Sequence, residues 1–526
     1  MGLKILCAVL TLLYCSYAVQ SAAILALFSS LSYTDHLVFR GYISLLTQKG
    51  HTVVLMTPYP GQFQYPDVEK IIELDVGQDS APFWDEYRRL TTNVDDYFPR
   101  LRALNEFSLK LAIAQLKSQQ MQALLINPNI KFDLVITEAD VPLFYAVAEK
   151  YKVPHISITT SNGKIHQYEA KGNPIHPILY PDVNTLNYKN LTRWQKVLEF
   201  YRHLQTKNEY YNHYLPLSEI AAKKLLGLQR DLQEVEYDID LLLIAANPIL
   251  VGNRPTVPAI IYADRLHLRP NAVLPQNWKT VLDSATKGVI YFSLGVTQDA
   301  ELLSPSILQT MSEAFKELPF TVLWKIGNTT MINKPDNVIA EGWFPQQELL
   351  SHPNVKAFIT HGGARSLEEA IYYQVPIVGL PIVRSRKPFI REVTKFGTGE
   401  ILDPYQLDKE TLKATISAVA TDDKYKQAMI KLKDMIYDPV ISGPENALWW
   451  TEYVLRHNGA RHLRSPAVGV SFFKYYMLDL LSYFLIACLF VLYLSYLILR
   501  YVYRRLRQRF RGVPDLGGKG GKFKAL

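Results

Sequence analysis

Apolar runs alternate with helix-like stretches along the first part of the chain. Two apolar runs, residues 22–28 and 51–58, flank a helical stretch at 38–50, and the order strand, helix, strand returns over residues 132–160. Short buried strands that are linked through helices are typical of a parallel sheet with helices on its faces. The pattern therefore predicts a first α/β domain over residues 22–246.

A second α/β pattern covers residues 287–440, after a Pro-punctuated stretch at 247–286 that indicates a linker. Strand-like runs and helices alternate there as they do in the first domain, and a further helix is predicted at 443–457. Two such domains that face each other place a ligand cleft between the carboxyl ends of their sheets. The predicted fold class is thus α/β, with two doubly wound domains.

The two ends of the chain carry signals of a different kind. Residues 1–21 combine Lys4 with a short apolar run and small residues, the pattern of a secretory signal peptide. Residues 480–499 are 20 residues without a charge, long enough to cross a bilayer of about 30 Å. The tail, residues 500–526, has nine Lys or Arg and one Asp, which places it in the cytosol by the positive-inside rule. We therefore expect a single-pass type I membrane protein whose bulk is lumenal.

Charge and cysteine content exclude some kinds of binding partner and active site. The formal net charge of +8 is carried entirely by the tail, so the basic balance does not indicate a nucleic-acid partner. The three cysteines lie in the signal and in the span, so the lumenal part has no disulfide, no cysteine nucleophile and no cysteine-based zinc site. No metal centre is predicted. Asn190 and Asn328 are glycosylation acceptors, and Lys522 with Lys524 resembles a retrieval signal for the endoplasmic reticulum, although such pairs also arise by chance in basic tails.

The most informative stretch is "AFITHGGARSLEEA", residues 357–370. An apolar strand ends at His361, two glycines follow, and a helix begins near Ser366. Glycines let the backbone come close to a ligand, and a helix N-terminus offers free N–H groups and a partial positive charge. The stretch predicts a phosphate site that includes His361, Gly363 and Ser366, with Glu369 accepting hydrogen bonds from a ribose. The alternative is a glycine-rich turn with a capping histidine.

A second motif, "GWFPQQELLSHP" (342–353), precedes it. Trp343 can stack on a flat base and Gln346 can hydrogen-bond its edge, although a lone Trp is more often a core residue. Taken together, the two motifs resemble the signature of the UDP-glycosyltransferases, specifically their membrane-anchored animal and insect-virus branch. The resemblance runs almost end to end and includes "QKGHTVVLMT" (48–57), "FDLVITEA" (132–139), "GVIYFSLG" (288–295) and "ALWWTEYVLRHNGARHLR" (447–464).

The resemblance implies the GT-B fold, in which the second domain holds a UDP-sugar and the first holds a small lipophilic acceptor. It also implies that the helix within residues 441–470 returns to the N-terminal domain. The reaction is an inverting transfer, with the UDP-sugar as co-substrate and no further cofactor. The residues matched to UDP binding are Trp343 and Gln346 for uracil, His361, Gly363 and Ser366 for phosphate, and Glu369 for ribose.

The residues for proton transfer depart from the family. Its base is a His after the first strand, which a carboxylate at the end of a later strand holds. Here Asp35 falls on the position of the base, His36 is one place late, and Glu138 matches the carboxylate, with Asp140 as a nearby substitute. Two alternatives stay open: the loop re-forms so that His36 acts, or the base is lost.

The sugar-binding positions depart as well. Val296 replaces a phosphate-contacting hydroxyl, and Ser385 and Arg386 stand where the family has Asp-Gln. Asp264 and Arg265 replace a glycine pair in the linker. Arg386 is interpreted as a solvated charge in a relaxed loop, the alternative being a guanidinium that pairs with an acidic sugar or with the diphosphate.

Two hypotheses about function follow. The first is a UDP-glycosyltransferase of the endoplasmic reticulum membrane that transfers a hexose, with UDP-glucose as the donor that the resemblance favours, to a small lipophilic acceptor in detoxification. The second is a catalytically impaired family member that binds a nucleotide or a lipophile, or that pairs with active relatives as a homo- or hetero-oligomer.

Overall fold

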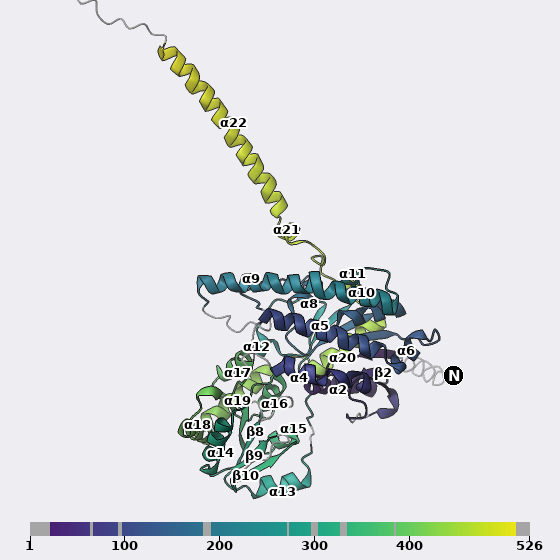
Figure 1. Ribbon diagram of the computed structural model, residues 1–526, viewed down its shortest axis with the longest axis vertical. Coiled ribbons are helices and arrows are strands. Elements are labelled where there is room, and N and C mark those ends of the chain that lie inside the picture. Colours follow the sequence, from purple (N-terminus) through teal and green to yellow (C-terminus); the bar gives the residue numbers. More distant parts are fainter. Residues whose placement is uncertain are drawn as a thin grey trace, which may run out of the picture. The chain divides into compact units, whose positions relative to one another are not determined.

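The computed structural model describes residues 21–63, 67–92, 97–181, 191–270, 273–295, 303–326, 334–382 and 386–511. The chain forms two compact units, one ending at Val468 and the other beginning at Gly469, and each is described by itself. In Figure 1 the first unit holds two α/β domains, one coloured purple to blue and the other teal to green.

Seven parallel strands form the sheet of the first domain, in the order β3-β2-β1-β4-β5-β6-β7. Their bounds are β1 Ala23–Leu27, β2 Thr52–Thr57, β3 Ile71–Asp75, β4 Leu134–Glu138, β5 His155–Thr159, β6 Leu241–Ile244 and β7 Ile260–Tyr262. Strand β1 lies at the centre and pairs Leu25 with Val54 on one side and with Val135 on the other. Helices cover both faces, which explains why the inner strands are continuous apolar runs and why their side chains are buried.

The helices of the first domain follow the strands closely along the chain. They are α2 Tyr33–Gln48, η1 Val68–Lys70, α3 Gly77–Ser80, η2 Ala81–Phe83, α4 Trp84–Thr92, α5 Tyr97–Leu116, α6 Gln119–Ile126, η3 Pro142–Phe144, α7 Tyr145–Tyr151, α8 Ile165–Ala170, α9 Arg193–Glu209, the π-helix η4 Tyr210–Tyr214, α10 Leu215–Leu226, α11 Leu232–Asp238 and α12 Pro248–Val251. Helix α2 begins after the cap residue Ser32 and buries Val38, Phe39 and Tyr42 against the sheet. This places the start of α2 at the carboxyl end of β1.

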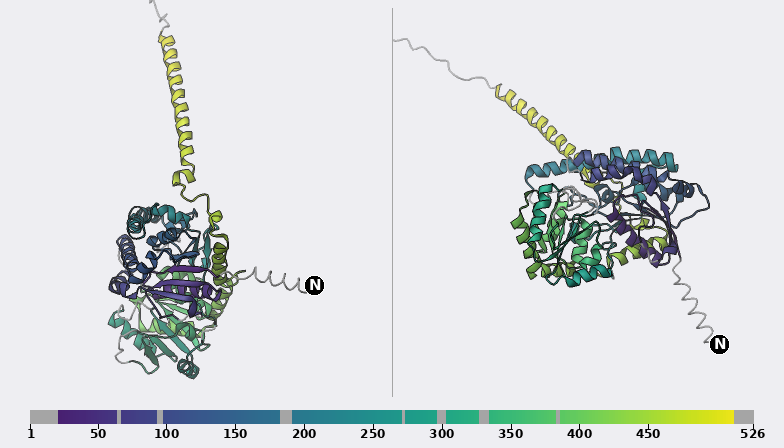
Figure 2. Two further views of the ribbon diagram at one scale, coloured as in Figure 1. Left: turned by 90° about the vertical axis from the view of Figure 1, so that its right-hand side faces the viewer. Right: turned by 60° about the horizontal axis from the view of Figure 1, so that its bottom comes forward.

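Six parallel strands form the second sheet, in the order β10-β9-β8-β11-β12-β13. Their bounds are β8 Val289–Ser293, β9 Thr321–Lys325, β10 Val338–Glu341, β11 Val355–Thr360, β12 Ile377–Gly379 and β13 Gly399–Ile401. The helices are α13 Gln276–Ser284, α14 Pro305–Lys316, α15 Gln346–Leu350, α16 Ala364–Tyr372, α17 Lys387–Thr394, η7 Pro404–Gln406, α18 Lys409–Thr421 and α19 Asp423–Ile436. The prediction of two parallel α/β domains is confirmed, and Figure 2 shows them from two further sides.

Helix α20, Gly443–His457, packs against the first domain although it follows the second in sequence. The Tyr42 hydroxyl of α2 lies 2.5 Å from the Thr451 hydroxyl of α20, and the His51 imidazole lies 2.5 Å from the Glu452 carboxylate. Figure 1 shows α20 beside α2. The short 3-10 helix η8, Arg461–Leu463, follows before the first unit ends.

The stretch predicted as a linker is corrected by the structure. Strand β7 lies within residues 247–286 and pairs with β6, so the first sheet reaches Tyr262. Farther on, α13 buries Leu282 in the core of the second domain. The sequence analysis missed this strand because it has only three residues and prolines lie on both sides of it, and proline normally marks a loop.

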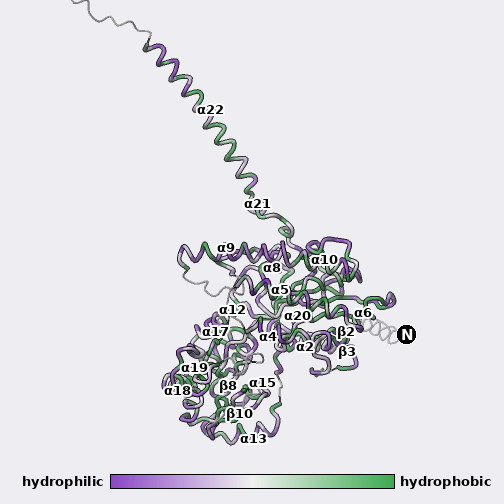
Figure 3. Tube along the Cα trace, in the orientation of Figure 1, coloured by the Kyte–Doolittle hydropathy of each residue, from purple (hydrophilic) through white to green (hydrophobic). Residues whose placement is uncertain are grey.

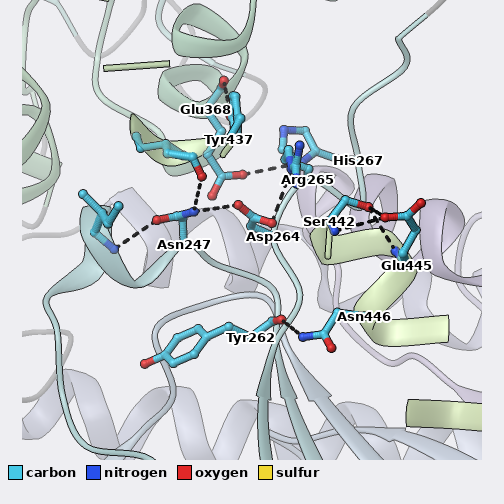
Figure 4. Close-up of polar contacts among 12 residues, drawn as sticks. Asn247, Tyr262, Asp264, Arg265, His267, Glu368, Tyr437, Ser442, Glu445 and Asn446 are labelled. Atoms are coloured by element: carbon cyan, nitrogen blue, oxygen red, sulfur yellow. Dashed lines mark hydrogen bonds and ion pairs between the residues drawn. The ribbon is translucent and has the colours of Figure 1, made fainter. Parts of the chain in front are cut away.

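Where the chain crosses between the domains, two segments are tied together (Figure 4). Asn247 donates from Nδ2 to the Asp264 carboxylate at 2.7 Å, and the Arg265 guanidinium lies 4.7 Å from the centre of the Tyr437 ring. A Cβ at Gly443 would lie 2.2 Å from Asp264 Oδ1, so only glycine fits beside that carboxylate. The Asp264–Arg265 pair, which replaces two glycines of the family, is thus built into a packed junction.

The second unit consists of helices α21, Phe472–Tyr475, and α22, Leu478–Arg511. Residues Leu478–Arg509 are long and apolar enough to cross a membrane, by length and composition. In Figure 3, α22 is mainly green along the half that follows α21 and purple toward its other end. This agrees with the predicted span at 480–499 and with the basic residues that follow it.

Candidate active site in the interdomain cleft

A cleft of about 740 Å³ lies between the two domains, at the carboxyl ends of both sheets. Residues of both domains line it. Of the residues predicted for the site, those that line the cleft are Asp35, Asp140, Trp343, Gln346, His361, Gly363, Ser366, Glu369 and Arg386. The structure therefore brings the described residues predicted for UDP binding together with Asp35 in one cleft.

The turn between β11 and α16 is built around the His361 ring. A Cβ at Gly295 would lie 2.6 Å from the imidazole Cε1, and one at Gly363 would lie 3.0 Å from it. Gly362 has φ +90, and a Cβ there would lie 2.2 Å from Ile390. Glycine is required at 295 and 362, because the imidazole and a buried aliphatic side chain take the space of a Cβ there, whereas at 363 a Cβ would be a tight contact.

This turn presents hydrogen-bond donors to the cleft. Gly363 caps α16, so the N–H groups of the next residues have no partner within the helix. His361 is buried, and its Nδ1 atom makes no hydrogen bond with the described residues. Burial and the nearby Arg386 and Lys325 charges lower the pKa of His361 to about 3, so the ring is neutral at physiological pH. The free N–H groups of the helix N-terminus suit an anion.

The residues predicted for uracil and ribose form one hydrogen-bonded cluster. Gln346 donates from Nε2 to the Glu369 carboxylate at 2.5 Å and lies 3.2 Å from the Ser366 hydroxyl. Tyr291 donates its hydroxyl to Gln346 Oε1 at 3.2 Å, and Gln347 donates to the second Glu369 oxygen at 3.2 Å. Burial raises the pKa of Glu369 to about 7. The cluster fixes the side chains of Gln346 and Glu369 along one side of the cleft.

Trp343 is not a core residue, because 54% of its surface is exposed. Its ring meets that of Tyr33, from the first domain, edge to face at 5.6 Å between centroids. The Lys325 ammonium lies 4.6 Å from the ring centroid. An exposed indole at the rim of the cleft is available for stacking on a planar base, as the sequence predicts.

Arg386, interpreted from the sequence as a solvated charge in a relaxed loop, lies at the wall of the cleft. The residue is half-buried and lines the cleft, and burial lowers the pKa of its guanidinium while the charge of Asp35 opposes that shift. The guanidinium makes no hydrogen bond or ion pair with the described residues. The loop lies at the interface with the other domain, which the sequence alone does not place beside it.

Arg365 is a residue of the cleft that the sequence analysis missed. It lies in the first turn of α16, donates to the Glu368 carboxylate at 2.7 Å and also donates to the backbone oxygen of Thr160 in the first domain. It therefore joins the two domains across the cleft. The signal in the sequence was a basic residue directly after the glycine pair, at the N-terminus of a helix.

Asp35 lies in the first turn of α2 and faces the cleft. Its carboxylate accepts a hydrogen bond from the Ser30 hydroxyl at 3.3 Å, and its backbone N–H donates to the Ser32 hydroxyl. Burial raises the pKa of the carboxyl, and the Arg365 charge and a hydrogen bond with Thr160 oppose this rise. A raised pKa makes a carboxylate a stronger base.

His36 points away from the cleft. It is 3% exposed, its Nε2 atom lies 2.7 Å from the Ser30 backbone oxygen, and its ring packs against Phe39 and Tyr59 at 5.4 and 4.9 Å between centroids. Burial lowers the pKa of His36 to about 4. The alternative in which the loop turns His36 toward the substrate is not the arrangement in this structure.

Glu138 ends β4 beneath the turn that precedes α2. One of its carboxylate oxygens accepts from the backbone N–H groups of Ser29 and Ser30, both at 3.0 Å. Burial and the neighbouring acids Asp140 and Asp35 raise the pKa of Glu138 to about 8. Neither Glu138 nor His36 is among the described residues that line the cleft, whereas Asp140 lines it and pairs with Lys164 at 3.1 Å.

Some predictions lie outside the described residues. They concern the signal peptide, the tail from residue 512, the glycosylation sites Asn190 and Asn328, Val296 and Ser385. Within the part of the chain that the structure describes, no group of three His, Cys, Asp or Glu side chains is placed to hold a metal ion.

Comparison with known proteins shows which family the sequence matches. The family model "UDP-glucoronosyl and UDP-glucosyl transferase" matches residues 25–511. An ecdysteroid UDP-glucosyltransferase of Spodoptera littoralis nuclear polyhedrosis virus is 29% identical over 88% of this chain and 94% of its own length. UDP-glycosyltransferase UGT5 of Dactylopius coccus is 29% identical over 86% of each chain. UDP-glucuronosyltransferase 2B14 of Oryctolagus cuniculus is 29% identical over 72% of this chain and 71% of its own.

Solved structures confirm the fold. Glycosyltransferase VinC in complex with DTDP has a TM-score of 0.57 at 17% identity, over 83% of this chain and 100% of that protein. CalG4, the calicheamicin glycosyltransferase, has a TM-score of 0.53 at 18% identity, over 83% of this chain and 99% of its own. Both have the GT-B arrangement, so the predicted fold is confirmed.

Proposed function

The chain belongs to the UDP-glucuronosyl and UDP-glucosyl transferase family, and from this premise we propose that it transfers a hexose from a UDP-sugar to the hydroxyl of a small lipophilic acceptor. The proposal depends on one observation: the residues matched to UDP binding and the candidate base line the same cleft from different domains. The Gln346–Ser366–Glu369 cluster and the His361 turn line one side, and Asp35 lines the other.

The donor is held by the second domain in this proposal. Trp343 stacks on uracil, Gln346 meets its edge, and Glu369 accepts from the ribose. The diphosphate lies at the N-terminus of α16 beside the neutral His361 ring, where N–H donors stabilise the charge that develops on UDP as it leaves. Glucose is the sugar named in the viral relatives and in a UDP-glucosyltransferase of Dactylopius coccus, and we propose it as the donor sugar.

The acceptor is held by the first domain. Apolar and aromatic side chains of that domain, among them Phe63, Tyr87, Leu101 and Leu104, line the same cleft, which suits a lipophilic molecule. The acceptor oxygen attacks the anomeric carbon as the bond from that carbon to UDP breaks, which inverts the configuration. The Asp35 carboxylate takes the hydroxyl proton, because it is the titratable group of the base position that faces the cleft.

Glu138 has a positioning role in this scheme. Its carboxylate holds the backbone N–H groups of Ser29 and Ser30, and the Ser30 hydroxyl in turn donates to Asp35. The contact fixes the turn that presents the base. Glu138 therefore acts through Asp35 and does not touch the substrate.

The experiment that tests the proposal is calorimetry on the full-length protein in detergent, with UDP, UDP-glucose and UDP-glucuronic acid, followed by turnover with a panel of lipophilic alcohols. Tighter binding of UDP-glucose than of UDP, with turnover, supports the transferase and its donor. Absence of binding by all three nucleotides would remove the proposal.

A second candidate is the impaired family member that binds nucleotide or lipophile, alone or as the partner of active relatives. The observation that favours it is the burial of His36 away from the cleft, which leaves a carboxylate in the position of the base. UDP binding without turnover, unchanged in the variant Asp35→Asn, is the result that this candidate predicts.

We also propose that the protein is anchored in the membrane of the endoplasmic reticulum by the helix Leu478–Arg509, with its bulk lumenal and a short basic tail in the cytosol. The apolar span and the excess of basic residues after it support this orientation. Protease protection of the bulk in sealed microsomes, together with cleavage of an epitope at the C-terminus, is the expected result. The opposite protection pattern would reverse the orientation.

A further inference from the structure

Arg365 is a buried cation at a place in the second domain that favours anions. It lies in the first turn of α16, only 7% of its surface is exposed, and it lines the cleft. A helix N-terminus carries a partial positive charge, so a basic side chain there is unfavourable unless other groups compensate it. Burial is unfavourable too, because the guanidinium loses contact with water. The position of Arg365 therefore depends on the groups that surround it.

Two partners hold the guanidinium, and they belong to different domains. One of its nitrogens donates to the Glu368 carboxylate, within α16, at 2.7 Å. Another donates to the backbone oxygen of Thr160, which follows β5 in the first domain. The donors of a guanidinium are fixed in one plane, so two bonds made at once define its direction. Arg365 thereby fixes the turn after β5 relative to the start of α16.

The Glu368 carboxylate is itself held inside the second domain. The residue is buried, and its Oε2 atom lies 3.6 Å from Nδ1 of His267, next to which Figure 4 shows it. Burial raises the pKa of Glu368 to about 7, and the charge and hydrogen bond of Arg365 oppose this rise. The Arg365 contact thus favours the ionised carboxylate, and the buried carboxylate anchors the guanidinium on the side of the second domain.

Thr160 connects this contact to the candidate base. It makes a hydrogen bond with the Asp35 carboxyl, and both residues line the cleft together with Arg365. A chain of contacts therefore runs from the N-terminus of α16, where the proposed function places the diphosphate, through Arg365 and Thr160 to Asp35. The Arg365 charge also acts on Asp35 directly, because it opposes the rise in pKa that burial causes.

Charged and titratable groups of both domains face Asp35. They are Arg365 and Arg386 of the second domain, and Asp140, Glu138, Tyr59 and Tyr87 of the first. Neighbouring acids disfavour the carboxylate form of Asp35, whereas the two arginines favour it. Arg365 also has a hydrogen bond to the first domain, so it combines a charge near the base with a defined position.

We propose that Arg365 is a positioning residue of the transfer reaction, which holds Thr160, and through it Asp35, in a fixed place relative to the leaving group at the N-terminus of α16. The inference rests on the proposed function and deepens it. Arg365 acts through Thr160 and through its charge, and does not touch the reacting atoms. A role in stability alone would change folding without changing the pH at which the protein becomes active.

The test is the pH profile of kcat for the full-length protein in detergent, with UDP-glucose and the alcohol of the panel above that has the highest kcat/KM. In Arg365→Gln the charge is gone, so Asp35 should ionise at a higher pH and the acid limb of the profile should move to higher pH. We expect kcat at pH 7 to fall by about 10- to 100-fold through misplacement of the base, while calorimetry gives a UDP affinity within a few-fold of the wild type.

Two further variants separate charge from position. Arg365→Lys keeps the charge without the planar fork, so it should return the acid limb toward the wild-type pH and restore kcat only in part. Thr160→Val keeps the backbone oxygen that Arg365 binds but removes the hydroxyl, so it should move the limb in the same direction as Arg365→Gln. Arg230→Gln is the matched control and should leave the limb in place, because its partners Glu149, Glu234 and Asp238 do not line the cleft.

An acid limb at the wild-type pH in both Arg365→Gln and Thr160→Val overturns the inference. So does a loss of UDP affinity in an Arg365→Gln protein that keeps the wild-type Tm and limb, because Arg365 then belongs to the nucleotide site. If Arg365→Gln does not fold, the limb of Thr160→Val decides alone. A wild-type protein that binds UDP but transfers nothing to any alcohol refutes the transfer reaction together with this inference, whereas normal turnover with unmoved limbs refutes the inference only.

Discussion

Two strand-to-helix turns line the cleft, one from each domain. They differ in whether their backbone N–H groups have hydrogen-bond partners within the chain. After β11, Gly362 donates its backbone N–H to the Thr360 hydroxyl at 3.2 Å, and the first N–H groups of α16 have no partner within the helix, beside a neutral imidazole. After β1, the N–H groups of Ser29 and Ser30 are already taken by the carboxylate of Glu138. The second domain leaves helix N–H groups open to the cleft, whereas in the first domain the carboxyl group of Glu138 occupies the N–H groups of the turn.

The difference begins in the sequence of the two turns. Glycines at 362 and 363 allow the positive φ and the close approach to Ile390 and His361 that the open turn needs. The first turn has serines instead: their N–H groups bind Glu138, and the Ser30 hydroxyl binds Asp35. In the proposed function, the same βα connection thus binds the leaving group in one domain and holds the base in the other.

Among the variants of the two turns, Asp35→Asn should have the largest effect on activity. We expect kcat to fall by about 10²- to 10⁴-fold, the usual contribution of a general base, while UDP affinity changes little because the nucleotide residues lie in the other domain. In the wild type, the rate should rise with pH as the Asp35 carboxyl ionises, at a pH above the usual range for Asp because burial raises its pKa. The pH profile of turnover measures this limb, which the variant should lack.

The matched control is His36→Gln. Because His36 is buried and bonds to the Ser30 backbone oxygen, we expect this variant to lose at most a few-fold in kcat. The opposite pattern, with His36→Gln inactive and Asp35→Asn active, would show that the loop re-forms and that His36 is the base.

Trp343→Ala tests the nucleotide side of the comparison. Stacking of a base on an aromatic side chain contributes about 1–3 kcal/mol, so UDP affinity should fall by about 10- to 100-fold. The exposed ring makes few buried contacts, so folding should be unaffected. Calorimetry with UDP gives the affinity, and Trp449→Ala, at another exposed Trp on α20, is the control. Equal affinities for the wild type and Trp343→Ala would place uracil elsewhere.

Arg386→Gln tests whether this guanidinium contacts the donor sugar. A guanidinium without a partner in the described residues is suited to a carboxylate, and a charge-assisted hydrogen bond contributes about 1.5–3 kcal/mol. If a hexuronic acid is accepted, its transfer should fall about tenfold or more in this variant, while UDP-glucose transfer stays within a few-fold. The ratio of kcat/KM for the two donors is the readout. An unchanged ratio would show that Arg386 does not contact the sugar.

Local patterns predicted the sheets and the nucleotide side of the cleft, because each strand, glycine pair and helix start is encoded within a few residues. Local sequence could not show which of Asp35 and His36 faces the cleft. Successive residues of a helix point about 100° apart, so the direction of each depends on where Ser32 begins α2. The role of Arg365 depends on its hydrogen bond with Thr160, and that of Arg386 on the nearby charge of Asp35. Both partners belong to the other domain, which no short stretch of sequence contains.

Glu138→Gln should have the smallest effect on activity and a clear effect on the pH dependence of stability. Burial raises the pKa of Glu138 from 4.5 to about 8, so between these values the folded protein holds a proton that the unfolded chain releases. Stability should therefore fall as the pH rises through this window, by up to about 1.4 kcal/mol per pH unit for one proton. Glutamine keeps an oxygen that accepts from Ser29 and Ser30 but carries no proton to lose, so its Tm should fall less between pH 5.5 and pH 7.5. Glu138→Leu, which has no acceptor, should be less stable at both pH values. If the wild type and Glu138→Gln lose Tm in parallel, Glu138 is already ionised in the folded protein, and the closed turn of the first domain holds a charge after all.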